Sequence, residues 1–114
     1  MATTLYDLES LRNLVDGNEE FKKYLIELFI ETTPPILQDI RQSFAAKDWT
    51  SLYAHSHKIK PTIESMGIFG MKPFINEIMI ISKQKKELAK LDTMVPEFCN
   101  TIDEVIIQLK ENEI

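Results

Sequence analysis

The sequence is poor in several features that define common classes of protein. It has one cysteine, Cys99, so no disulfide can form within the chain, which fits a reducing compartment. Three glycines and five prolines in 114 residues disfavour a turn-rich all-β fold. The longest apolar run, residues 78–81, is far shorter than the roughly 20 residues of a membrane span, and no signal peptide is recognisable at the N-terminus. We therefore expect a cytoplasmic monomer with a single domain over residues 1–114.

Charge is also one-sided, with 18 acidic and 13 basic side chains and a net charge of −5. This balance argues against nucleic acid or an anionic membrane as a partner. The basic residues are concentrated in residues 51–90, where seven face only three acidic ones, whereas residues 1–50 and 91–114 are both acidic. Two interpretations stay open: an ordinary solvated surface, or a middle segment that contacts the acidic surface of a partner.

Apolar residues recur every three or four positions along nearly the whole chain, which predicts an all-α fold. Asn18 and Asp48 are expected N-caps, Gly67 a left-handed helix end, and Pro34-Pro35 a kink within a long helix. The expected helices cover residues 8–15, 18–46, 48–67, 70–86 and a last stretch that begins after an N-cap at 92 or 93, with Pro96 in its first turn. Because the loops are short, we expect an antiparallel up-down-up-down four-helix bundle with an additional short N-terminal helix.

The same periodicity predicts which face of each helix is buried. In the helix over 48–67 this face comprises Leu52, Ser56, Ile59, Ile63 and Met66. In the long helix over 18–46 it comprises Phe21, Leu25, Leu28, Thr32, Ile36, Ile40 and Phe44. Cys99 lies beside apolar neighbours in the last helix and is expected to be a small core residue.

Both histidines of the chain, His55 and His57, fall on the helix over 48–67. At 3.6 residues per turn, His57 projects well outside the buried face and His55 lies on its shoulder, on the other side. Residues two positions apart on a helix do not share a face, so the pair cannot chelate one metal ion, and no metal site is expected. From geometry alone, a surface histidine without a role is the simpler interpretation of His57.

The segment S-H-K-I-K-P-T-I-E-S-M-G, residues 56–67, resembles the signature of histidine-containing phosphotransfer domains. That signature is a histidine followed by an aliphatic residue at +2, lysine at +3, a small residue at +4 and an aliphatic–glycine pair at +9 and +10. The matching residues here are His57, Ile59, Lys60, Pro61, Met66 and Gly67. Counting from His55 does not reproduce the pattern, so the register selects His57.

The resemblance implies that His57 accepts a phosphoryl group and that Lys60 stabilises its charge. It also implies a docking face for receiver domains, on which we place Tyr53, Lys58, Pro61 and Glu64. We expect an exposed apolar patch beside His57 that is drawn from the histidine helix and the start of the long helix over 18–46. Mg²⁺ and the acidic residues that bind it are expected on the partner receiver, and no cofactor is expected in this chain. The protein is then a stoichiometric phosphoryl carrier between receiver aspartates in a His–Asp multistep phosphorelay, and not an enzyme.

Two positions depart from the family pattern. Pro61 stands where glycine is usual, and proline removes the amide that would bond to the His57 carbonyl. Met79 stands where several members of the family place glutamine or glutamate near the histidine ring, and Asn76, one turn earlier, is the nearest polar substitute. These departures leave open an alternative, a helical module that binds receivers or other signalling domains without carrying phosphate.

Overall fold

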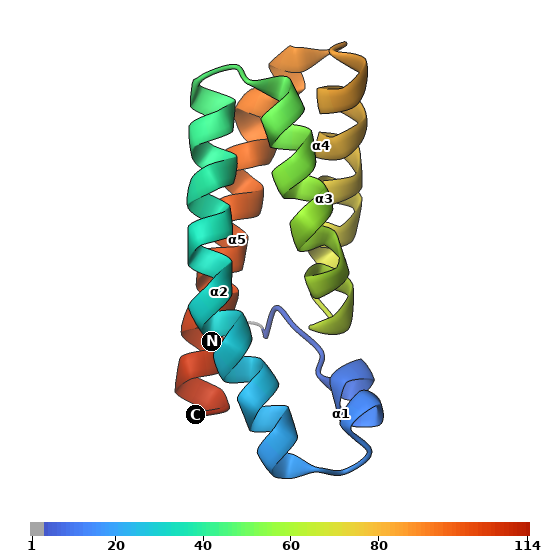
Figure 1. Cartoon of the computed structure of the whole chain (residues 1–114), viewed down its shortest axis with the longest axis vertical. Coiled ribbons are helices and arrows are strands. Elements are labelled where there is room, and N and C mark those ends of the chain that lie inside the picture. Colours follow the sequence, from blue (N-terminus) through green and yellow to red (C-terminus); the bar gives the residue numbers. More distant parts are fainter. Residues whose placement is uncertain (1–3) are drawn as a thin grey trace.

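The computed structural model describes residues 4–114, and every regular element in this range is helical (Figure 1). The α-helices are α1 (Glu9–Val15), α2 (Glu19–Ala45), α3 (Trp49–Ser65), α4 (Lys72–Gln84) and α5 (Leu91–Asn112). Two single 3₁₀ turns, η1 (Phe69–Met71) and η2 (Leu88–Lys90), precede α4 and α5. The all-α prediction is confirmed, with five helices in the order expected.

Helices α2 and α3 each begin with a side-chain N-cap. The Asn18 Oδ1 atom accepts a hydrogen bond from the Phe21 amide at 3.0 Å, at the start of α2. Asp48 accepts from the Ser51 amide at 3.2 Å and from the Ser51 hydroxyl at 2.7 Å, at the start of α3. These two donors hold the pKa of the Asp48 carboxyl below its usual value. Both N-caps were expected from the sequence and are confirmed.

Helix α2 runs without a break through Pro34 and Pro35. Figure 1 shows its first part leaning away from the line of the remainder. This matches the expected kink, since each proline removes a helical hydrogen bond without ending the helix.

The buried face of α2 differs from the predicted one by about one position. The residues that are buried are Ile26, Phe29, Thr33, Leu37, Ile40 and Ser43. Phe21 and Leu28, both predicted to be buried, are 44% and 40% exposed. Ile40 is buried as predicted. The rest of the predicted face is shifted because apolar residues occur in adjacent pairs along much of α2, so two neighbouring faces have the same period. Tertiary packing fully buries one row, and it leaves Leu25, Ile36 and Phe44 of the adjacent row only partly buried against the core.

The predicted beginnings of the last two helices also need correction. Helix α5 begins at Leu91 with no side-chain cap, and Pro96 lies inside it instead of in its first turn. Neither Asp92 nor Thr93 is the N-cap; the Thr93 hydroxyl donates to the Lys90 carbonyl at 3.2 Å. Helix α4 begins at Lys72 instead of near Gly70. In both cases a 3₁₀ turn leads directly into the helix and supplies the preceding turn without a capping side chain.

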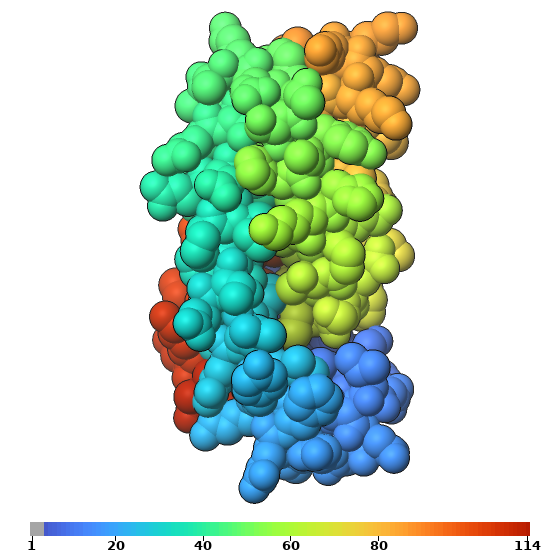
Figure 2. All heavy atoms as spheres, in the orientation of Figure 1, coloured from blue at the N-terminus to red at the C-terminus, as the bar shows by residue number. Residues whose placement is uncertain are grey.

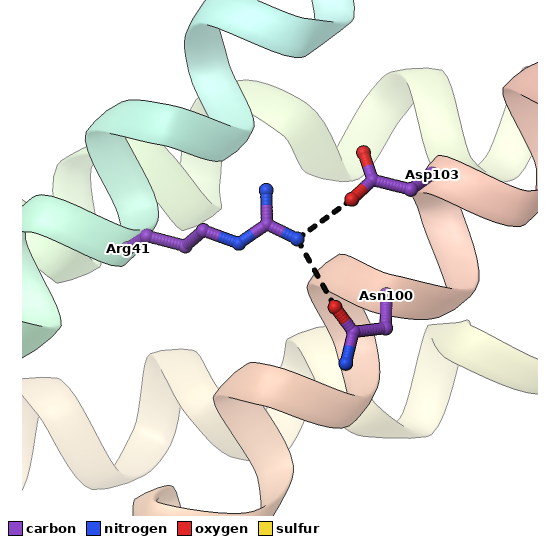
Figure 3. A network of polar contacts seen from close by, with 3 residues as sticks. All are labelled: Arg41, Asn100 and Asp103. Atoms are coloured by element: carbon purple, nitrogen blue, oxygen red, sulfur yellow. Dashed lines mark hydrogen bonds and ion pairs between the residues drawn. The ribbon is translucent and has the colours of Figure 1, made fainter.

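Four helices enclose the core. Helix α3 packs against α2 and α4, and α5 packs against the same two helices from the other side. The predicted buried face of α3 is confirmed, since all five of its residues are buried. Cys99 is fully buried, as expected, and burial raises the pKa of its thiol to about 11. At the surface, Arg41 of α2 bonds to Asp103 at 2.7 Å and to Asn100 at 3.2 Å, both on α5 (Figure 3).

Gly67, just after α3, packs against the backbone of the segment that precedes α1. Its φ of +65° is in the left-handed region, as predicted, and its carbonyl accepts a hydrogen bond from the Asp7 amide at 3.1 Å. A Cβ atom at this position would overlap the Asp7 backbone. Glycine is therefore required here for two reasons, the sign of φ and the close approach of another backbone.

We expect Gly67→Ala to lower the free energy of unfolding by more than the roughly 1–2 kcal/mol cost of a left-handed alanine. Gly17→Ala is the matched control, because Gly17 also has a positive φ of +79° but no atom lies near the added Cβ. Urea denaturation of both variants measures the difference. Equal losses would mean that the Asp7 contact does not contribute to stability.

Candidate functional site

The buried face of α3 determines where the histidines point. Leu52, Ile59 and Ile63 are fully buried and fix the rotation of the helix against its neighbours. His57 is exposed on the outer surface, whereas His55 is half-buried. This difference is the one expected from helix geometry, and it leaves His57 open to an incoming partner.

His57 lies against an aromatic ring. The centroids of the Tyr53 and His57 rings are 6.1 Å apart, with an interplanar angle of 30°. The Lys83 Nζ atom, from α4, lies 5.6 Å from the centroid of the Tyr53 ring. Tyr53 therefore connects the histidine helix to a cation on the neighbouring helix.

A hollow of about 400 Å³ lies between α3 and α4 beside this contact. It brings together three residues that the sequence had suggested for the site: Tyr53, Lys60 and Asn76. The remaining lining residues are Met79, Ile80 and Lys83. The hollow thus carries two lysines on an otherwise largely apolar surface.

Lys83 was not among the residues suggested by the sequence. A signal was available, because Asn76, Met79, Ile80 and Lys83 recur at helical spacing and so share one face of α4. Only the packing of α4 against α3 shows that this face borders the histidine helix.

The other suggested residues lie on the outer surface of α3. Lys58, Pro61 and Glu64 are exposed, and within residues 4–114 no ion pair joins Glu64 to Lys60. Helix α3 continues through Pro61, which has no amide hydrogen to donate to the His57 carbonyl.

An apolar face borders the other side of α3. We define it by Leu14, Phe21, Tyr24 and Leu28, of which Leu14 is 69% and Tyr24 56% exposed. The rings of Phe21 and Tyr24 stack with centroids 6.2 Å apart. Figure 2 shows the end of α3 next to α1 and the start of α2 on one surface.

A smaller hollow connects this apolar face to the histidine helix. It has a volume of about 180 Å³ and includes Leu14 and Leu28 together with Thr62 and Ser65 of α3. We call the exposed residues His57, Lys58, Pro61 and Glu64 the exposed strip of α3. The apolar face lies on the α1–α2 side of α3, and the lysine-lined hollow lies on its α4 side.

Other kinds of site find little support in the part of the chain that the structure describes. Residues 4–114 contain no group of three or more His, Cys, Asp or Glu side chains that could hold a metal ion. None of the helices described is both long and apolar enough to cross a bilayer.

Comparison with known proteins gives one informative similarity. The chain is 28% identical over 103 residues to a protein of Dictyostelium discoideum named "Phosphorelay intermediate protein rdeA". The similarity covers 90% of this chain but only 40% of the length of that relative. No family model and no solved structure matches the chain. This similarity to a phosphorelay protein agrees with the resemblance to histidine-containing phosphotransfer domains that the spacing from His57 to Gly67 indicates.

Proposed function

We propose that this protein carries a phosphoryl group between receiver domains in a His–Asp multistep phosphorelay, with His57 as the phosphoacceptor. The observation that carries the proposal is the exposed His57 on a rigid helix, at the position that the family signature requires. The printed name of the similar Dictyostelium protein, a phosphorelay intermediate, supports the same kind of process.

The proposed reaction needs only an accessible imidazole on this chain and a partner receiver domain that is phosphorylated on its aspartate. A neutral ring nitrogen attacks the aspartyl phosphate of a receiver, a P–N bond forms, and the P–O bond to the aspartate breaks to give back the carboxylate. The proton on the other ring nitrogen passes to water. The reverse sequence then delivers the phosphoryl group to a second receiver. The partner would supply Mg²⁺, and this chain would act as a stoichiometric carrier.

In this proposal Lys60 and Lys83 neutralise the charge of the phosphoryl group. Lys60 is one helical turn beyond His57, and both lysines line the hollow next to Tyr53. Phosphoryl transfer depends mainly on positioning and on stabilising charge, so cations beside the acceptor are the contribution expected of the carrier. Asn76 lines the same hollow and is the polar group available where Met79 cannot form a strong hydrogen bond.

We further propose that receivers dock across the exposed strip of α3 and the adjacent apolar face. Four exposed apolar side chains on two adjoining helices form a surface suited to a protein partner. Tyr53, Lys58, Pro61 and Glu64 would contribute from α3. The proposal includes an up-down-up-down arrangement of α2 to α5 as the scaffold, and a monomer that works in the cytoplasm.

A docking module that carries no phosphate is the second candidate. Pro61 and Met79 favour it, because both differ from the residues usual near the acceptor histidine in the family. The two candidates share a binding surface and differ only in whether His57 is phosphorylated.

Labelling by a charged receiver separates these candidates. We expect acetyl-phosphate-charged receivers to label the wild type with an acid-labile, alkali-stable phosphate, and His57→Gln to abolish the label. His55→Gln is the control and should still be labelled, because His55 is half-buried and outside the signature register. Full labelling of the His57 variant would contradict the proposed acceptor. A wild type that no receiver of the same cell labels would favour the docking module.

The role of Lys60 predicts a kinetic effect without a loss of folding. Lys60→Ala should slow phosphoryl transfer by about tenfold or more, since a charge-assisted hydrogen bond contributes about 1.5–3 kcal/mol. Lys110→Ala removes the same charge from an exposed position on α5 and should transfer at the wild-type rate. Rapid-mixing kinetics provides the rates, and circular dichroism checks the fold. Equal rates in the two variants would assign Lys60 to the solvated surface.

Docking on the apolar face predicts that a charge placed there weakens receiver binding. Leu28→Glu should raise the Kd by roughly fivefold or more, because truncated or charged interface anchors cost more than about 1 kcal/mol. Ile107→Glu is the matched control, since Ile107 is similarly exposed, at 47%, but lies on α5. Titration calorimetry measures both affinities. A larger effect at Ile107 would place the receiver on a different surface.

A further inference from the structure

We infer that Tyr53 is a positioning residue for the phosphoryl transfer, which it serves by holding the imidazole of His57 in a restricted set of orientations. The inference rests on the proposed function of His57. It adds a second role to the place of Tyr53 on the docking face, because this role acts through the histidine and not through the partner.

The contact between the two rings follows from their spacing on α3. Tyr53 and His57 are four residues apart, so their side chains lie on the same face of the helix, one turn apart. Their centroid separation of 6.1 Å lies within the range of about 4.5–7 Å in which aromatic rings attract each other. The tyrosine ring therefore lies beside the exposed imidazole, close enough to favour some of its orientations.

Tyr53 can restrict His57 because it is itself held in place. It is half-buried and forms part of the wall between α3 and α4. The Lys83 Nζ atom is 5.6 Å from its ring centroid, within the roughly 6 Å over which a cation and an aromatic ring attract each other. The tyrosine thus has one contact with the neighbouring helix and one with the acceptor ring.

Restricting the imidazole matters for an in-line transfer. A solvent-exposed histidine exchanges between rotamers, and only some of them direct a ring nitrogen at the phosphorus atom of a docked receiver. Holding a reacting group close to its productive orientation lowers the entropic part of the barrier. A contact that biases the rotamers therefore increases the maximal rate of transfer without changing how tightly the receiver binds.

The contact itself can be tested without a partner. In the free protein, the imidazole C–H resonances of His57 should show a ring-current shift that disappears in Tyr53→Leu and persists in Tyr53→Phe. Phenylalanine is the matched control, because it keeps the ring and removes only the hydroxyl. A shift that is unchanged in Tyr53→Leu would overturn the inference.

The kinetic test separates positioning from docking. At saturating receiver, Tyr53→Leu should reduce the maximal rate of transfer to His57 by about three- to tenfold, the range expected for one aromatic contact. Tyr53→Phe should restore most of the rate. The receiver concentration at half-maximal rate is measured separately, because Tyr53 also lies on the proposed docking face and the inference concerns only the maximal rate. Circular dichroism confirms that the leucine variant is folded.

The outcomes distinguish this inference from the function on which it rests. If Tyr53→Leu raises the half-saturating concentration and leaves the maximal rate unchanged, Tyr53 is a docking residue and the inference is wrong. Wild-type maximal rates and affinity in Tyr53→Leu would also overturn it, while leaving the proposed carrier intact. If the wild type is not labelled at all, the proposed function fails and the inference fails with it.

Discussion

The candidate site depends on the burial of one face of α3. Leu52, Ile59 and Ile63 have no exposed surface, so the helix cannot rotate without bringing polar residues into the core. With that rotation fixed, His57 must point to solvent, and Tyr53 and Lys60 must border α4. The same burial that stabilises the fold therefore also presents His57, the proposed acceptor, to solvent.

The positive charge near the candidate site comes from a few local lysines and not from the net charge of the chain. The protein has a net charge of −5, yet Lys60 and Lys83 line one hollow together with Tyr53, the residue whose ring contacts His57. Because charges on an exposed surface are screened over about 8–10 Å, a phosphoryl group would experience these lysines much more than the distant acidic residues. Local placement therefore reconciles the acidic net charge of the protein with the anionic phosphoryl group that we propose it carries.

The two faces of α2 show how one helix can serve both stability and recognition. Ile26 and Phe29 belong to the core, while their neighbours Phe21 and Leu28 remain exposed beside α1. Exposed apolar side chains reduce solubility, so a patch of them is best explained by an interaction surface. The error in the predicted buried face of α2 thus falls at the surface where we propose that the partner binds.

The sequence by itself determined the helical class, the N-caps at Asn18 and Asp48, the left-handed Gly67 and the outward position of His57 compared with His55. These features are set by hydrogen bonds and periodicity within a few residues, which a sequence displays directly. Only the tertiary structure decided which of the two apolar faces of α2 is buried and that Lys83 lies against Tyr53. Both depend on how separate helices rotate and pack against each other, and the period within one helix carries no information about its neighbour.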